Sequence, residues 1–159
     1  SKFKAYGDVS KWICKEDITK GLAVRLVNNT RNVTSGTTTT AVSTLEVELY
    51  DSTTAPNEIS KGAAFLGIAL NDALAGETCF ICTKGITTIK IGNAMSQINC
   101  GSYGTLVFSS QKGYVVGVPS GNLISSDTPV AGYFLEDITT AVSFGDLLLF
   151  NVQGNYEFS

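Results

Sequence analysis

The hexapeptide Leu45-Glu46-Val47-Glu48-Leu49-Tyr50 alternates apolar residues with glutamates and a tyrosine. Successive side chains of a β-strand point to opposite faces, so this alternation predicts a strand with one buried face and one wet face. We expect Leu45, Val47 and Leu49 to face the core. Glu46 and Glu48 are then expected to share the solvent face.

Patterns of the same kind fill the rest of the chain, in which Thr, Val, Ile, Gly and Ser dominate. No stretch keeps helical apolar spacing for three turns, which favours an all-β fold: a compact barrel or sandwich of about nine short strands. The strands are expected at residues 22–27, 41–50, 65–70, 77–83, 87–91, 104–108, 114–118, 130–135 and 147–152.

The segments between these strands are rich in turn formers. Residues 109–113 predict a hairpin turn, and residues 71–75 and 93–97 each predict a single helical turn capped by Asn or Asp. Long polar loops are expected at residues 28–40, 51–60 and 120–129, the first of which is also compatible with a long hairpin tip.

The chain is expected to form one β domain over residues 18–159, preceded by an N-terminal arm or first strand over residues 1–17. Glu16-Asp17-Ile18-Thr19 recurs as Glu136-Asp137-Ile138-Thr139. No fixed repeat period connects the two copies, so the echo predicts only two similar entries into strands.

Charge and hydropathy restrict the partners. The net charge is −3 with a pI near 4.8, and the basic residues are scattered, which argues against nucleic-acid binding. No apolar run reaches the length of a membrane helix, and the N-terminus lacks the apolar core of a secretory signal. We therefore expect that the chain does not associate with a membrane and that it is synthesised in the cytosol.

The sequence contains no histidine, which removes the side chain that most often transfers protons near neutral pH. The acid pairs Glu16/Asp17, Glu46/Glu48 and Glu136/Asp137 are read as surface residues rather than as a glycosidase pair. Cys79 and Cys82 have the spacing of a redox or zinc half-site but lie on a predicted strand, which points their sulfur atoms to opposite faces. We therefore expect mostly buried thiols rather than a redox or metal site. We predict no enzyme activity, no catalytic residues, no cofactor and no metal.

Three segments carry a resemblance to a known family. The chain resembles the tailed-phage head-decoration and capsid-stabilising proteins of β-tulip-type fold, in which I-x-x-G-x-x-V precedes G-x-A-x-x-x-A-x-x-G-E and a strand ending in Gly. The matching segments here are Ile18-Thr19-Lys20-Gly21-Leu22-Ala23-Val24, Phe65-Leu66-Gly67-Ile68-Ala69-Leu70-Asn71-Asp72-Ala73-Leu74-Ala75-Gly76-Glu77 and Thr83-Lys84-Gly85.

The resemblance implies a structural virion protein that binds and stabilises a viral capsid as a homotrimer on its surface. The major capsid protein would be the partner, and the N-terminal segment would add to one of its edge strands. The expected contact residues are Lys2, Phe3, Lys4, Tyr6 and Trp12, aromatic anchors beside basic groups.

Two alternatives remain. In one, the same β domain assembles into a filament, tube or fibre by donating a strand to the next copy. In the other, the chain is a receptor- or carbohydrate-binding domain of a fibre. That reading ranks last because the loops at residues 28–40 and 120–129 contain no aromatic side chain.

Overall fold

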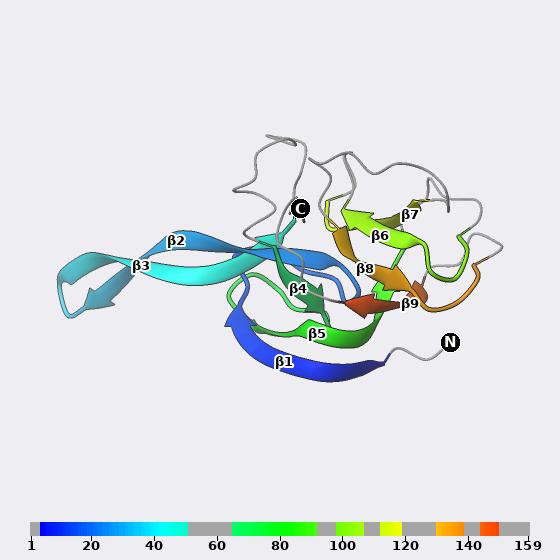
Figure 1. The fold of residues 1–159 in the computed structure, drawn as a ribbon. Helices are drawn as coiled ribbons and strands as arrows, with labels where there is room; N and C mark the ends of the chain where they lie inside the picture. The colour runs from blue at the N-terminus through cyan, green and yellow to red at the C-terminus, as the bar shows by residue number, and fades with distance from the viewer. Residues whose placement is uncertain are drawn as a thin grey trace, which may run out of the picture.

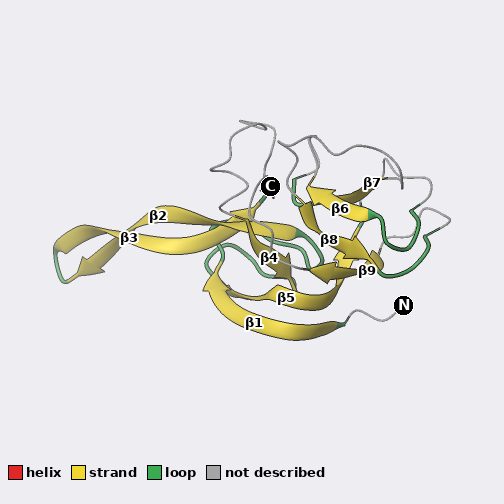
Figure 2. Cartoon of the chain, viewed as in Figure 1, coloured by secondary structure: helices red, strands yellow, loops and turns green. Residues whose placement is uncertain are grey.

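The computed structural model describes residues 4–50, 65–91, 98–106, 112–118, 130–138 and 144–149. This part of the chain is all-β, as the sequence predicted, and its sheet does not close into a barrel; the architecture is consistent with an all-β sandwich (Figures 1 and 2). The strands are β1 (Ala5–Ile13), β2 (Ala23–Ser35), β3 (Thr38–Leu49), β4 (Phe65–Ala69), β5 (Thr78–Lys90), β6 (Tyr103–Leu106), β7 (Val115–Val118), β8 (Val130–Phe134) and β9 (Phe144–Leu149).

The strands pair in the order β3-β2-β4-β5-β9-β8-β6-β7, and β1 pairs with β5 beside this path. The long strand β5 is central. One of its edges pairs with β1 along the whole of β1, and the other pairs first with β4 and then with β9. Figure 1 shows β1 lying along β5 at the border of the molecule.

Two clusters of buried side chains lie on opposite faces of β5. Cys79 and Ile81 belong to one, with Val24 and Val47, while Cys82 belongs to the other. The larger cluster contains Ala23, Tyr50, Phe65, Ile68, Cys82, Ile89, Ile91, Ile98, Val115, Ala131, Phe134 and Ile138. The alternation of side chains along one strand therefore serves two cores.

Several strand boundaries differ from the expected ones. The two strands predicted at residues 77–83 and 87–91 are parts of the single strand β5 (Thr78–Lys90), because Gly85 and Ile86 between them also pair with β1 and β9. The hairpin pairing of β6 with β7 is confirmed, and residues 28–40 form a hairpin rather than a loop. The segments 51–60, 93–97, 107–111 and 120–129 lie outside the described residues.

The predicted helical turn at residues 71–75 is wrong. Its backbone groups bond to distant parts of the chain: Ala73 and Ile18 exchange two hydrogen bonds, of 2.8 and 2.9 Å. The side chain of Asn71 accepts a 2.8 Å bond from the Phe80 amide instead of capping a helix. Tertiary pairing therefore overrides the local capping pattern.

The sequence echo marks two equivalent corners. In the first corner, residues 14–18 follow β1 and bond to residues 73–77. In the second corner, residues 134–138, which begin at the last residue of β8, bond to residues 98–102. Ile138 and Ile98 exchange two hydrogen bonds of 2.8 Å, as Ile18 and Ala73 do. The predicted likeness of the two strand entries stays a prediction, because residues 139–143 lie outside the described residues. The backbone pairing instead shows a likeness of the two corners, at which four residues of sequence only hinted.

The two corners also share their turn chemistry. Gly76 and Gly101 both have φ of 89°. The Gly76 amide donates to the carbonyl of Cys14, directly after β1, and the Gly101 amide donates to the carbonyl of Phe134, the last residue of β8. Asp17 and Asp137 each accept a backbone amide, from Ala75 at 2.9 Å and from Cys100 at 2.7 Å. A left-handed glycine and an aspartate cap thus close each corner.

Candidate binding surfaces

Strand β1 lies at an edge of the sheet. Among the described strands only β5 pairs with it, so the backbone groups on its other edge face outward. Three of its apolar side chains are exposed: Tyr6 by 64%, Val9 by 48% and Ile13 by 40%. Phe80, opposite Lys11 on β5, is exposed by 44% as well. An edge strand of this kind is a template for pairing with another chain.

The predicted contact residues occupy different places around β1. Lys2 and Phe3 lie outside the described residues. Tyr6 is exposed, whereas Trp12 is half-buried, packs against the smaller core cluster and donates a 2.8 Å hydrogen bond from Nε1 to Ser10 Oγ. Trp12 also lines a shallow hollow of about 140 Å³ with Lys11, Ile13 and Thr78.

Lys4 is bound within its own chain. Its Nζ lies 2.9 Å from Asp146 Oδ2 on β9, and its backbone amide donates to Thr88 Oγ1 on β5. The hydrogen bond from Lys4 to Asp146 raises the lysine pKa, and Thr88 Oγ1 donates to the same carboxylate at 3.0 Å. Lys4, directly before β1, is therefore bound to β5 and β9 and does not belong to a free basic segment.

The second exposed element is the β2–β3 hairpin, which projects from the body of the molecule (Figure 1). Its strands pair without a bulge from Val24↔Leu49 to Ser35↔Thr38, and all side chains from residue 32 to residue 43 are exposed. We call residues 30–43 the arm. Val33 and Val42 are its exposed apolar side chains, by 53% and 39%.

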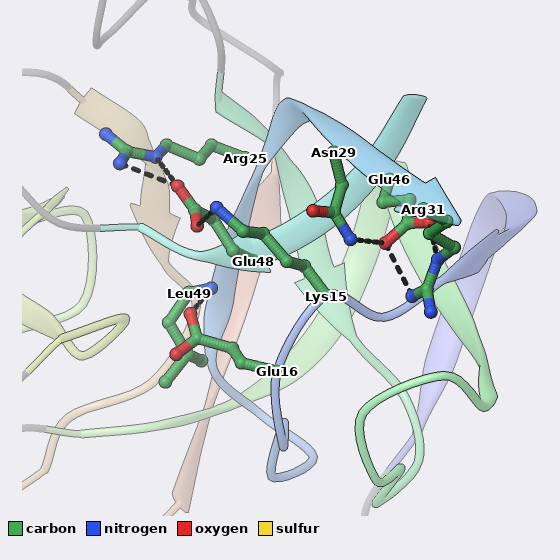
Figure 3. A network of polar contacts seen from close by, with 8 residues as sticks. All are labelled: Lys15, Glu16, Arg25, Asn29, Arg31, Glu46, Glu48 and Leu49. Atoms are coloured by element: carbon green, nitrogen blue, oxygen red, sulfur yellow. Dashed lines mark hydrogen bonds and ion pairs between the residues drawn. The ribbon is translucent and has the colours of Figure 1, made fainter. Parts of the chain in front are cut away.

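Glu46, which the alternation placed on the wet face, is instead 1% exposed, and Leu45 is 50% exposed. The prediction was wrong because Glu46 has partners on the neighbouring strand (Figure 3). Arg31 Nε and Nη2 donate to its two carboxylate oxygens at 2.5 and 2.8 Å, and Asn29 Nδ2 and Thr44 Oγ1 add bonds of 3.0 and 2.7 Å.

These contacts fix the charge state of Glu46 and the geometry of the arm. The hydrogen bonds from Arg31, then those from Thr44 and Asn29, lower the pKa of Glu46 to about 2, against the opposing effect of burial. The carboxylate is therefore ionised at neutral pH. Because all its partners lie on β2 and β3, the network stiffens the hairpin where it leaves the body.

A second group of ion pairs holds the base of the hairpin (Figure 3). Arg25 Nη2 lies 2.7 Å and Lys15 Nζ 3.5 Å from the Glu48 carboxylate. Glu16 Oε2 accepts the Leu49 amide at 3.0 Å, and Cys14 forms a parallel bridge with Val47. The hairpin is thus anchored to the segment that follows β1.

Three further acidic side chains, Asp17, Asp72 and Glu77, stabilise turns. Three carboxylates line a hollow of about 320 Å³ beside the first corner. Each accepts a backbone amide: Asp17 from Ala75, Asp72 from Lys20 and Glu77 from Leu74, at 2.8–2.9 Å. In the part of the chain that the structure describes, no group of three or more candidate ligands is arranged to hold a metal ion.

The cysteines are free, and Cys14, Cys79 and Cys82 are buried whereas Cys100 is exposed. Cys79 and Cys82 lie in different core clusters, as expected for opposite faces of a strand. Burial raises the pKa of all three buried thiols, that of Cys14 to about 12. They are therefore protonated side chains of the core. No helix in the described ranges is long and apolar enough to span a membrane.

Comparisons with known proteins give limited information. No protein-family model matches the sequence, and no curated protein matches it. Among solved structures, the chain is similar to the head fiber gp8.5 N base of bacteriophage phi29, with 11% identity over 94% of this chain and 98% of that chain, and a TM-score of 0.49. At this level of similarity, neither the function nor the assembly of that protein transfers to this chain.

Proposed function

We propose that this chain is a structural protein of a viral particle, which binds the capsid surface and stabilises it as a decoration protein. The observation that supports the proposal best is the open outer edge of β1, which carries the exposed apolar side chains Tyr6, Val9 and Ile13. In this proposal the chain is not an enzyme, uses no cofactor or metal, and binds neither nucleic acid nor membrane.

Attachment would occur by strand addition. A strand of the major capsid protein pairs with the outer edge of β1, so that backbone donors and acceptors of both partners are satisfied. The exposed apolar side chains add burial, and the hollow beside Trp12 accepts a side chain of the partner. β1 thus contributes a strand that is already held in place by β5 rather than a flexible N-terminal segment, which lowers the entropic cost of binding.

Copies of the chain are proposed to sit as homotrimers where capsomers meet, after synthesis in the host cytoplasm. Simultaneous contacts by several subunits convert modest single interfaces into tight attachment. Within such a trimer, Lys2, Phe3, Tyr6 and Trp12 remain the proposed contact residues, whereas Lys4 contributes by tying β1 to Asp146.

Point substitutions test this proposal better than deletion of the N-terminal residues, because β1 is paired along its whole length and its removal would expose β5. We would add the purified protein to capsid shells of the encoding virus that lack it and measure co-sedimentation. Replacing both Val9 and Ile13 by Asp should abolish binding, since charges would be buried at the new strand pair. Leu135→Asp, at an equally exposed site after β8, is the matched control.

Equal binding of the double variant and the control would contradict attachment through β1. Light scattering of the protein alone addresses the alternative. Polymers that grow with concentration in the absence of shells, and that disappear in the double variant, would favour a filament or fibre subunit that assembles through β1.

A further inference from the structure

The edge of β3 within the arm lacks the features that normally protect sheet edges. β3 is the terminal strand of the sheet order, and in the described part of the chain its residues 38–45 pair only with β2. No Asp, Glu, Lys or Arg occurs between Arg31 and Glu46, and residues 38–45 contain no proline or glycine. Natural edges are usually protected by charge, proline or a bulge, and this one has none of them.

The composition of this edge favours pairing with an identical edge. Its residues are Thr-Thr-Thr-Ala-Val-Ser-Thr-Leu, mostly β-branched and uncharged. Segments with high β-propensity, no charge and no proline are the ones that pair with copies of themselves. The edge offers no charge that would select an acidic or a basic partner, whereas the corresponding edge of β2 carries Arg31.

Threonines already pair across this ribbon. The hydroxyls of Thr34 and Thr39, on facing strands, lie 3.0 Å apart. The Glu46 network stiffens the hairpin where it leaves the body, so the edge is preformed and little conformational entropy is lost when it pairs. The arm projects from the body (Figure 1), so its edge is open to a second copy.

We infer that residues 38–44 of β3 pair antiparallel with the same residues of a second copy, across a two-fold axis near Ala41. The two arms then form one four-stranded sheet. Such a contact is isologous and closes on itself, so each arm joins two copies. It goes beyond attachment to a shell: it links neighbouring copies of the chain to each other, whether the bodies are single or trimeric.

The test compares the full chain with two substitutions at Thr40, an exposed residue of the edge. Light scattering over a dilution series should show that the wild type self-associates and that Thr40→Lys weakens this at least about tenfold. In the inferred register each lysine lies opposite Val42 of the second copy and diagonal to the other lysine, so both charges are placed in the new strand pair. Thr40→Val keeps the β-propensity and adds no charge, so it should associate like the wild type. Far-UV circular dichroism checks that both variants fold.

A disulfide cross-link provides the second measurement. Ala41→Cys in a Cys100→Ser background should form a covalent dimer under mild oxidation, whereas Thr19→Cys, exposed on the body, should not. Masses that are identical for the wild type and Thr40→Lys at every concentration, or no cross-link at position 41, would overturn the inference. If the protein has the mass of a trimer and Thr40→Lys leaves that mass unchanged, the contact between arms is overturned while the proposed trimer stands. Neither experiment contains capsid shells, so neither outcome bears on attachment to the capsid.

Discussion

Replacing Glu46 by Gln tests whether the ionised carboxylate holds the hairpin. The substitution keeps the shape of the side chain and removes its charge. Arg31 then loses its anionic acceptor. The amide nitrogen that replaces one oxygen faces Arg31 in either orientation, together with Thr44 at the Oε2 position or Asn29 at the Oε1 position. The hydrogen bonds that lower the pKa of Glu46 to about 2 are therefore the interactions under test.

The expected cost follows from the exposure of the two partners. A hydrogen bond to a charged group stabilises a buried site by about 1.5–3 kcal/mol, whereas an exposed ion pair contributes less than about 1 kcal/mol. The side chain of Glu46 is 2% exposed and that of Arg31 is 40% exposed, so the pair lies between these limits. We expect Glu46→Gln to lower the free energy of unfolding at pH 7 by about 1.5 kcal/mol.

The effect should depend on pH in one direction. The pKa of Glu46 lies at about 2 in the folded protein and near 4.5 when unfolded, so its stabilisation is complete above pH 4.5. It is lost as the pH falls from 4.5 towards 2, because the carboxylate becomes protonated. The difference between Glu46→Gln and the wild type should therefore shrink over this range.

Urea denaturation at pH 7 and at stepped acidic pH measures the effect, with the fluorescence of Trp12 reporting on the body and circular dichroism on the strands. Hydrogen exchange of the arm amides shows whether the hairpin opens separately from the body. Asp8→Asn, an exposed carboxylate on β1, is the control and should change the stability by less than about 0.5 kcal/mol. Equal stability of Glu46→Gln and the wild type at pH 7, or a difference that persists near pH 2, would refute the reasoning.

Three further predictions follow from the packing. Gly85→Ala should destabilise the protein by about 3 kcal/mol or more in urea denaturation, because a Cβ there would lie 2.1 Å from the Tyr6 carbonyl oxygen at the β1–β5 contact; a near-neutral result would mean that β1 is not held at this spacing. Gly76→Ala and Gly101→Ala should each cost about 1–2 kcal/mol, since both have φ of 89° with open space around the new methyl, and clearly unequal costs would argue against equivalent corners. A thiol reagent should label Cys100 in the native protein and the buried cysteines only after unfolding, as mass spectrometry can show; rapid native labelling of Cys14 would contradict its burial.

Local pattern was sufficient for most of the strands. The all-β class, the pairing of β6 with β7 and the opposite orientation of Cys79 and Cys82 all depend on side-chain alternation and turn residues, which are short-range properties. The echo of Glu16-Asp17-Ile18-Thr19 was visible in the sequence as well. Its meaning was not, because the segments that complete the two corners, residues 73–77 and 98–102, share almost no sequence.

Long-range partners decided the rest. Glu46 follows the pattern of a solvent-facing residue, and only the register that places Arg31 and Asn29 beside it makes its burial favourable. Residues 71–75 carry helix-capping side chains, yet the backbone of Ala73 bonds to Ile18, more than fifty positions away. The candidate surfaces have the same origin: an exposed strand becomes a binding edge only when the sheet order leaves it unpaired. That order is a property of the whole chain, because no strand specifies its own neighbours.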